Sequence, residues 1–178
     1  HPGTLDLLAR GVIVILVGQA TRLSTYLTSD DKRYRAAVRL GFETTTYDRE
    51  GEEVARFDGE LPGMEEVMKA LEPFSGEIRQ VPPPYSAVKQ GGQAAYRRAR
   101  RGGDVQLEPR TITLYRVQIL DYEAPFLRLE VHCSAGTYLR SLAHDLGVAL
   151  GTGAHLYELC RTRSGPFRIE DAVSLDDL

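Results

Sequence analysis

The chain has 178 residues, of which 42% are hydrophobic and 26% are charged, a composition typical of one globular domain that can bury its own core. Its two cysteines form no Cys-x-x-Cys pair and its four histidines show no ligand spacing, so we expect no zinc site. We expect no other metal and no cofactor either. No apolar stretch approaches a membrane span and no signal-type segment opens the chain, so we expect a cytoplasmic protein with no membrane partner.

The first predicted element is a strand over 12–18, where six consecutive apolar residues are closed by Gly18. Most of the six are β-branched and no polar residue interrupts them, so we expect this strand to be buried on both faces. Asp6 precedes the strand and therefore lies at the edge of the core. A carboxylate there is either neutral or paired with a cation from elsewhere in the chain, although such an aspartate more commonly caps the backbone of a turn.

Further along the chain, helical and strand patterns alternate. In the segment 126–133 apolar and polar residues alternate, which is typical of a sheet with one solvent-facing side. A turn over 134–137 ends at Thr137, a residue type that often begins a helix. The remaining predicted elements are helices over 20–27, 63–74 and 138–150 and strands over 32–40 and 111–122. This order predicts a single α+β domain over 1–178, with a mixed sheet and flanking helices.

The charge is distributed unevenly, although the net charge of −3 argues against a nucleic-acid partner at first sight. The segment 78–103 has six basic and no acidic residues, which leaves 16 basic and 25 acidic residues for the rest of the chain. Much of the acidic excess lies in 43–72, which we expect to face solvent. This separation favours a polyanion bound against one face of the protein.

The basic segment reads as an insertion of about 82–103. It opens with the stiff stretch 82–86 (Pro-Pro-Pro-Tyr-Ser), and the glycine pairs 91–92 and 102–103 bracket a stretch predicted to be helical over 93–101. A solvated helix face is the simpler interpretation of such a charge run. The insertion nevertheless offers RNA both aromatic and cationic side chains, namely Tyr85, Lys89, Tyr96, Arg97, Arg98, Arg100 and Arg101.

Arg140, early in the last predicted helix, is a candidate partner for Asp6 because a guanidinium stays charged and can bind a carboxylate through two nitrogens. Residue types alone favour a different pairing, in which Arg140 contacts a nearby exposed acid such as Glu130.

Five segments in this order resemble the bacterial pseudouridine synthases of the TruB type, which isomerise a uridine in the T arm of transfer RNA. Together they run through nearly the whole chain. They are 1–6 (His-Pro-Gly-Thr-Leu-Asp) with 9–11 (Ala-Arg-Gly), 31–36 (Asp-Lys-Arg-Tyr-Arg-Ala), 84–89 (Pro-Tyr-Ser-Ala-Val-Lys), 133–142 (Cys-Ser-Ala-Gly-Thr-Tyr-Leu-Arg-Ser-Leu) and 151–162 (Gly-Thr-Gly-Ala-His-Leu, then Leu159, Arg161 and Thr162).

The resemblance implies the pseudouridine synthase fold and assigns roles to particular residues. Asp6 would be the catalytic aspartate, Tyr34 the ring that stacks on the target uracil and handles a proton, and Arg140 the partner that keeps Asp6 ionised. Leu159 would line the base pocket and His1 would hold the flipped-out loop. Tyr138 and Lys89 carry over as further RNA-binding residues, and the thumb-like insertion of the family corresponds to the basic segment. The implied partner is tRNA, bound by a monomer.

Two departures from the family pattern lie beside Asp6: Leu7 stands where the family usually has proline, and Pro2 stands where a smaller residue is common. Neither removes a reacting group. Relatives also carry a Lys-Pro motif before the first segment, and often a small RNA-binding domain of the PUA type at the C-terminal end. We expect the sequence to be a fragment of the natural enzyme without these parts.

Overall fold

The computed structural model describes residues 5–84, 86, 107–174 and 177, and the main chain alone at 89–90 and 93–94. In chain order the elements are β1 (Ala9–Gly11), the 3-10 helix η1 (Gly18–Leu23), α1 (Ser24–Ser29), β2 (Lys32–Leu40), β3 (Phe42–Thr44), β4 (Glu53–Arg56), α2 (Met64–Leu71), β5 (Gly76–Gln80), β6 (Lys89–Gln90), β7 (Gln93–Ala94), β8 (Arg110–Glu123), β9 (Phe126–Cys133), α4 (Leu139–Leu150), β10 (Ala154–Ser164), β11 (Phe167–Arg168) and the 3-10 helix η2 (Ile169–Asp171).

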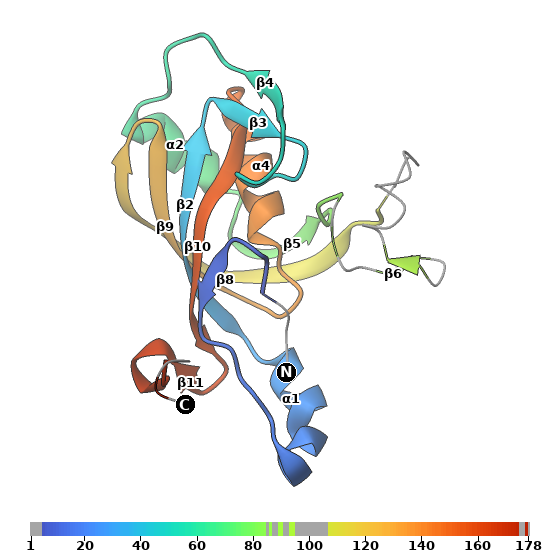
Figure 1. The fold of residues 1–178 in the computed structure, drawn as a ribbon. Helices are drawn as coiled ribbons and strands as arrows, with labels where there is room; N and C mark the ends of the chain where they lie inside the picture. The colour runs from blue at the N-terminus through green and yellow to red at the C-terminus, as the bar shows by residue number, and fades with distance from the viewer. Residues whose placement is uncertain are drawn as a thin grey trace.

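The described residues form a seven-stranded mixed sheet in the order β1-β10-β2-β9-β8-β5, with β11 paired to β10 (Figure 1). The β1–β10 pair is parallel and the other pairs are antiparallel. Helices α2 and α4 pack behind this sheet, and the hairpin of β3 and β4 lies at one end. The α+β prediction is confirmed. None of the helices in the described ranges has the length and apolar content that a bilayer crossing requires.

Helix α4 covers the centre of the sheet because its apolar residues recur every three or four positions. Leu139, Leu142, Ala143 and Leu146 are all buried against the sheet. The helix ends at Gly151, whose φ of 69° is the left-handed conformation that glycine adopts without steric cost. This packing places the first turn of α4 at the same edge of the sheet as the turn before β1.

Strands β2 and β9 lie where the sequence predicts them, β8 extends one residue further at each end than predicted, and the helix predicted over 63–74 forms but is shorter at both ends. The predicted helix over 20–27 is helical but divides into η1 and α1. Helix α2 spans Met64–Leu71, and its N-terminus is closed by the Glu66 carboxylate, which accepts a hydrogen bond from the Gly63 amide at 2.7 Å.

Three local predictions are wrong. Residues 12–17 form no ladder, and burial alternates: Val12 and Val14 are buried whereas Ile13 is 46% and Ile15 63% exposed. Val12 is joined to β10 by hydrogen bonds given to and received from Arg161, whereas the side chains of Ile13 and Ile15 are left partly uncovered. Thr137 does not cap α4, because its hydroxyl donates to the Ser134 carbonyl and closes the preceding turn.

The third error concerns the insertion. Gln93 and Ala94, predicted to be helical, form β7, which pairs with β6 in a short antiparallel hairpin. The rest of the predicted helix, 95–101, lies outside the described residues.

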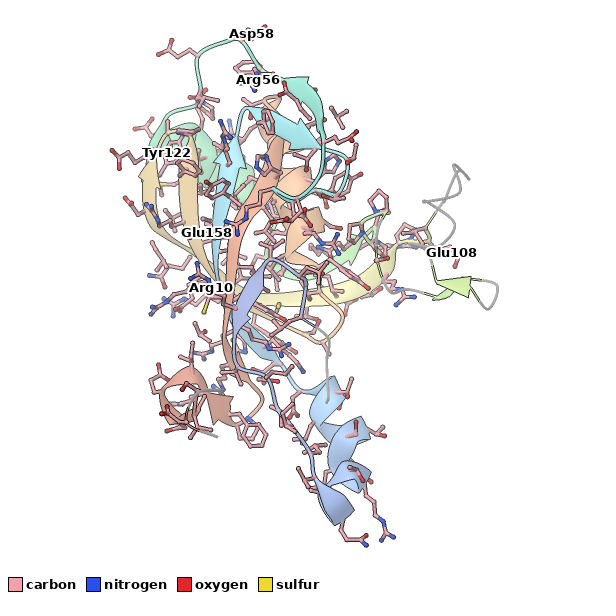
Figure 2. The ribbon with its side chains drawn as sticks, in the orientation of Figure 1. Arg10, Arg56, Asp58, Glu108, Tyr122 and Glu158 are labelled. Atoms are coloured by element: carbon pink, nitrogen blue, oxygen red, sulfur yellow. The ribbon has the colours of Figure 1, made fainter. Side chains whose placement is uncertain are left out.

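Figure 2 shows Arg56 and Asp58, from the acidic segment, at one end of the molecule, and Glu108, which follows the insertion, at a different side.

Candidate active site

Two adjoining cavities, of about 80 and 270 Å³, open beside the turn that carries Asp6. That turn is closed by a 2.9 Å hydrogen bond from the Ala9 amide to the Asp6 carbonyl, and β1 then pairs with β10. Gly11, with φ of 102°, ends β1 so close to the Arg161 carbonyl that a side chain would collide with it. The residues shared by both cavities are Asp6, Tyr34, Thr137 and Tyr138.

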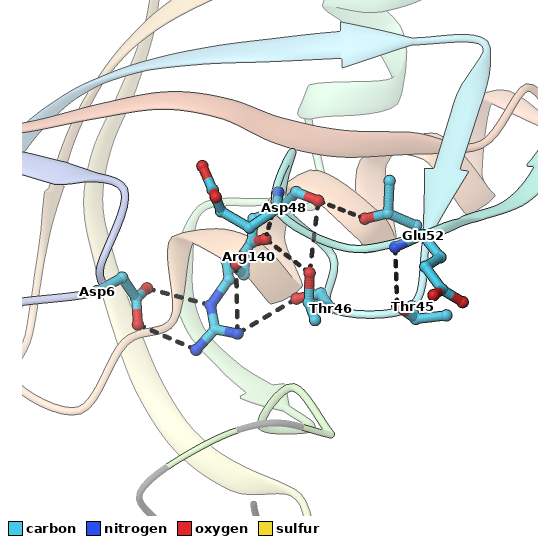
Figure 3. Close-up of polar contacts among 8 residues, drawn as sticks. Asp6, Thr45, Thr46, Asp48, Glu52 and Arg140 are labelled. Carbon is cyan, nitrogen blue, oxygen red and sulfur yellow. Dashed lines mark hydrogen bonds and ion pairs between the residues drawn. The ribbon is translucent and has the colours of Figure 1, made fainter. Parts of the chain in front are cut away.

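Asp6 and Arg140 form a two-point ion pair across the cavity (Figure 3). The Arg140 Nε donates to Asp6 Oδ2 at 3.1 Å and its Nη2 donates to Oδ1 at 3.0 Å. The side chain of Arg140 is 7% exposed and that of Asp6 is 29% exposed, so one carboxylate face remains open to the cavity. The paired geometry fixes the orientation of this carboxylate. The alternative pairing is wrong, because Glu130 contacts Arg35 instead.

The far side of Arg140 is held by a second carboxylate that sequence reasoning did not single out. Arg140 Nη1 donates to the Thr46 carbonyl at 3.2 Å and lies 3.5 Å from Asp48 Oδ2. The other oxygen of Asp48 accepts hydrogen bonds from the Thr46 hydroxyl at 2.6 Å and the Glu50 amide at 3.0 Å. Asp48 is buried, which contradicts the expectation that acids of 43–72 face solvent. Its sequence context, a turn rich in threonine, carries no signal for this role.

Tyr34 lies on the cavity face of β2 and Leu159 on the neighbouring strand β10. Burial is the main cause that raises the pKa of Tyr34 to about 12, so its hydroxyl is protonated at neutral pH. Leu159 is buried and borders the smaller cavity together with Leu5. An aromatic ring and an aliphatic side chain thus flank the open face of Asp6, which suits a flat heterocycle.

Two more buried cations, Lys32 and Arg161, line the larger cavity. Lys32 Nζ donates to three carbonyls at the end of α1, those of Leu27, Thr28 and Asp30. Burial lowers the pKa of Lys32. Sequence reasoning missed the positions of both cations, because a basic residue within a strand is more often exposed.

The backbone of Tyr138, the residue before α4, is clamped by the side chain of Gln80. The Gln80 amide nitrogen donates to the Tyr138 carbonyl at 3.0 Å, and its oxygen accepts from the Tyr138 amide at 2.8 Å. The Ser141 hydroxyl donates to the Val81 carbonyl at 2.7 Å. Three hydrogen bonds therefore join the end of β5, where the insertion begins, to the turn of α4 that carries Arg140.

Replacing Gln80 with leucine is expected to lower the free energy of unfolding by about 2 to 4 kcal/mol, because two main-chain groups lose their partners at a site that is 2% exposed. Urea titration followed by circular dichroism measures this change. The matched control is Gln118→Leu on the exposed side of β8, where we expect little change. An equal effect at both positions would contradict the clamp.

The structure thus brings together five of the predicted site residues, namely Asp6, Tyr34, Arg140, Tyr138 and Leu159. For Lys89 it describes the strand β6 but not the side chain. The other predicted RNA-binding residues lie outside the described part of the chain; they are His1, Tyr85, Arg97, Arg98, Arg100 and Arg101.

Comparison with protein families gives two adjacent matches. Residues 1–139 match the N-terminal domain of the TruB family pseudouridylate synthases, and residues 140–178 match the C-terminal domain of tRNA pseudouridylate synthase B. The chain belongs to the TruB family. The family resemblance inferred from the five sequence segments is therefore confirmed.

Curated relatives named tRNA pseudouridine synthase B cover the whole of this chain. The protein of Francisella philomiragia is 47% identical over 180 residues, that of Symbiobacterium thermophilum 48% over 181 and that of Clostridium tetani 43% over 178. The chain spans 59%, 60% and 62% of these relatives, respectively.

Solved structures show the same fold. The chain matches a chain of a Cbf5–Nop10–Gar1 complex with a TM-score of 0.75 and 35% identity, covering all of this chain and 44% of that one. A second match, with a TM-score of 0.71 and 32% identity, is to an H/ACA RNP bound to a substrate RNA containing 2′-deoxyuridine and covers 42% of that chain. The pseudouridine synthase fold predicted from sequence is confirmed.

Proposed function

We propose that this chain isomerises a uridine of tRNA to pseudouridine, and that the uridine is the one at position 55 in the T arm. The observation that carries the proposal is the two-point pair of Asp6 and Arg140, which faces a cavity bordered by Tyr34 and Leu159. Membership of the TruB family supports it. The whole of 1–178 would act as the catalytic domain, with 82–103 as its RNA-binding insertion.

The reaction breaks the bond from ribose C1′ to uracil N1 and makes a bond from C1′ to C5. It transfers no electrons to or from the substrate, so the required groups are a carboxylate, a cation beside it and a platform for the freed base. Asp6 supplies the carboxylate, which acts either by attacking C1′ or by taking a proton from the ribose. Addition of Asp6 to the uracil ring is a third route.

The target uridine must leave its stack before Asp6 can reach C1′. Tyr34 and Leu159 would replace the lost stacking, because they lie on adjacent strands at the cavity. His1 would hold the flipped-out loop, as the family resemblance implies. Tyr138, which also borders the cavity, would contact the same nucleotide.

The experiment that tests the proposal uses a T-arm stem-loop RNA that carries tritium at C5 of its uridines. The new bond at C5 expels that hydrogen, so turnover appears as tritium released to water. RNA that is bound without any release would contradict the proposal and favour a non-catalytic RNA-binding protein. Release that depends on an added guide RNA would favour an RNA-guided enzyme over the stand-alone monomer of the cytoplasm that we propose.

The basic insertion is proposed to bind phosphates rather than read bases. Replacing Arg97, Arg98, Arg100 and Arg101 with glutamine is expected to weaken RNA binding and to flatten its dependence on salt, since each lost phosphate contact lowers the slope by about 0.7 to 0.9. Filter binding at several salt concentrations measures both quantities. A matched control replaces four arginines outside the insertion, Arg22, Arg49, Arg56 and Arg128. Equal affinity and slope in the insertion variant would show that the insertion is not a phosphate clamp.

A further inference from the structure

Arg161 is a buried cation that the proposed reaction has not yet used. It is 1% exposed, and its Nε donates to the Val12 carbonyl at 2.8 Å. Its Nη2 is buried and has no hydrogen-bond partner among the described residues. Burying a guanidinium without a carboxylate beside it lowers the stability of the fold. An arginine would therefore rarely be used only to join the segment at Val12 to β10.

The position of Arg161 connects it to Tyr34. The two residues lie opposite each other in the β2–β10 ladder, where facing side chains are close neighbours. Both line the larger cavity together with Asp6. The positive charge of Arg161 lowers the pKa of Tyr34, against the larger effect of burial, which raises it.

We propose that Arg161 is a positioning residue that acts through Tyr34: its buried guanidinium stabilises the phenolate that Tyr34 becomes during proton transfer. This inference rests on the proposed function. As C1′ leaves N1, the Tyr34 hydroxyl gives its proton to the uracil. After the C1′–C5 bond has formed, the phenolate takes the proton from C5. N1 thus gains one proton, C5 loses one and the phenol is restored.

The other groups around Tyr34 do not supply this charge. Burial raises the pKa of Cys133 on β9 to about 12, so that thiol is neutral. Asp6 raises the pKa of Tyr34, because an anion disfavours a second anion nearby. Lys32 on β2 and Arg140 on α4 also border the cavity, but their charged groups are engaged by the α1 carbonyls and by Asp6, respectively. Among these groups, Arg161 therefore has a buried donor, its Nη2, that can stabilise the Tyr34 phenolate.

The test places 3-fluorotyrosine at position 34 and follows its ionisation by 19F NMR, because fluorination brings the pKa of a phenol into an accessible range. In Arg161→Met and Arg161→Gln we expect this pKa to rise by about one to three units, since an adjacent positive charge is lost. Arg161→Lys retains a positive charge and should stay near the unaltered chain. The control is Arg163→Met on the same strand, whose Nε also donates to a carbonyl, that of Gly165.

Turnover with the tritiated RNA supplies a second readout. A higher pKa makes the Tyr34 phenol a weaker acid toward the uracil, so Arg161→Met and Arg161→Gln should lower kcat at pH 7 by up to about tenfold for each unit of pKa, while KM changes little. Arg161→Lys should keep most of the rate. A purely structural role for Arg161 would affect the lysine and methionine variants alike.

The two hypotheses fail in different ways. A Tyr34 pKa that is the same in the unaltered chain, Arg161→Met and Arg161→Gln overturns the role of Arg161, whatever the turnover. No tritium release by the unaltered chain contradicts the proposed function, and the 19F titration then still decides whether Arg161 controls the ionisation of Tyr34.

Discussion

Replacing Asp6 with asparagine is expected to abolish tritium release from the T-arm RNA while leaving RNA binding and folding unchanged. The amide has the size of the carboxylate, and its oxygen can still accept a hydrogen bond from Arg140. It can neither attack C1′ nor accept a ribose proton at a useful rate. The loss should reach at least about three orders of magnitude, as is typical when a group essential for the chemistry is removed. Isotope release measured beside RNA affinity separates the two effects.

The matched control is Asp58→Asn, which removes an exposed carboxylate from the loop between β4 and α2, at one end of the molecule (Figure 2). This variant should release tritium at the rate of the unaltered chain. Turnover by Asp6→Asn at a rate similar to that of Asp58→Asn would refute the assignment of Asp6. A loss of RNA binding in Asp6→Asn alone would instead assign Asp6 to recognition.

The sequence predicts strands β2, β8 and β9 closely, and of these β9 alternates most regularly. In β9, apolar residues face the core at every second position, and β2 and β9 pair without interruption. Strand β10 was not predicted, although it carries Leu159 and Arg161. Its register shifts twice, between Leu156 and Glu158 and again between Arg161 and Arg163, and each shift breaks the two-residue period.

The candidate site was only partly predictable for a related reason. Asp6 and Arg140 are 134 positions apart, and residue types alone favour Glu130 as the partner of the arginine. Residue type makes Arg140 a candidate partner for Asp6, but it was the resemblance to a family that favoured the pair that the structure contains. Asp48 and Gln80 have no local signature, because Asp48 owes its role to Arg140 and Gln80 to the main chain of Tyr138, and both contacts depend on the tertiary packing.

The run over 12–17 shows a different limit. An uninterrupted series of β-branched residues predicts burial on both faces, yet Ile15 is 63% exposed. Hydrophobicity reports what a segment can bury and not which neighbours are present to cover it. In the structure, the segment is joined to β10 at Val12, whose amide donates to the Arg161 carbonyl and whose carbonyl accepts from the Arg161 side chain.

Removing the guanidinium in Arg140→Ala should reduce turnover by about two orders of magnitude or more and also destabilise the fold. The arginine is the countercharge of Asp6 and contacts Asp48, which is buried, so its loss leaves two carboxylates facing an empty space. Removing one partner of a buried ion pair lowers the free energy of unfolding by about 3 to 5 kcal/mol. Because the Asp6 side chain is 29% exposed, we expect a loss at the lower end of that range or less. Urea unfolding and tritium release measure the two effects separately.

Two further variants separate charge from geometry at this position. Arg140→Lys keeps a positive charge, but a single ammonium cannot bind both Asp6 oxygens and the Thr46 carbonyl in the planar arrangement seen here. We therefore expect Arg140→Lys to recover stability more fully than turnover. Arg128→Ala removes an exposed arginine that pairs with Asp121 and should change neither. If Arg140→Ala turned over at the rate of Arg128→Ala, the carboxylate would not need its partner, and the orientation of Asp6 would have to come from the turn before β1 alone.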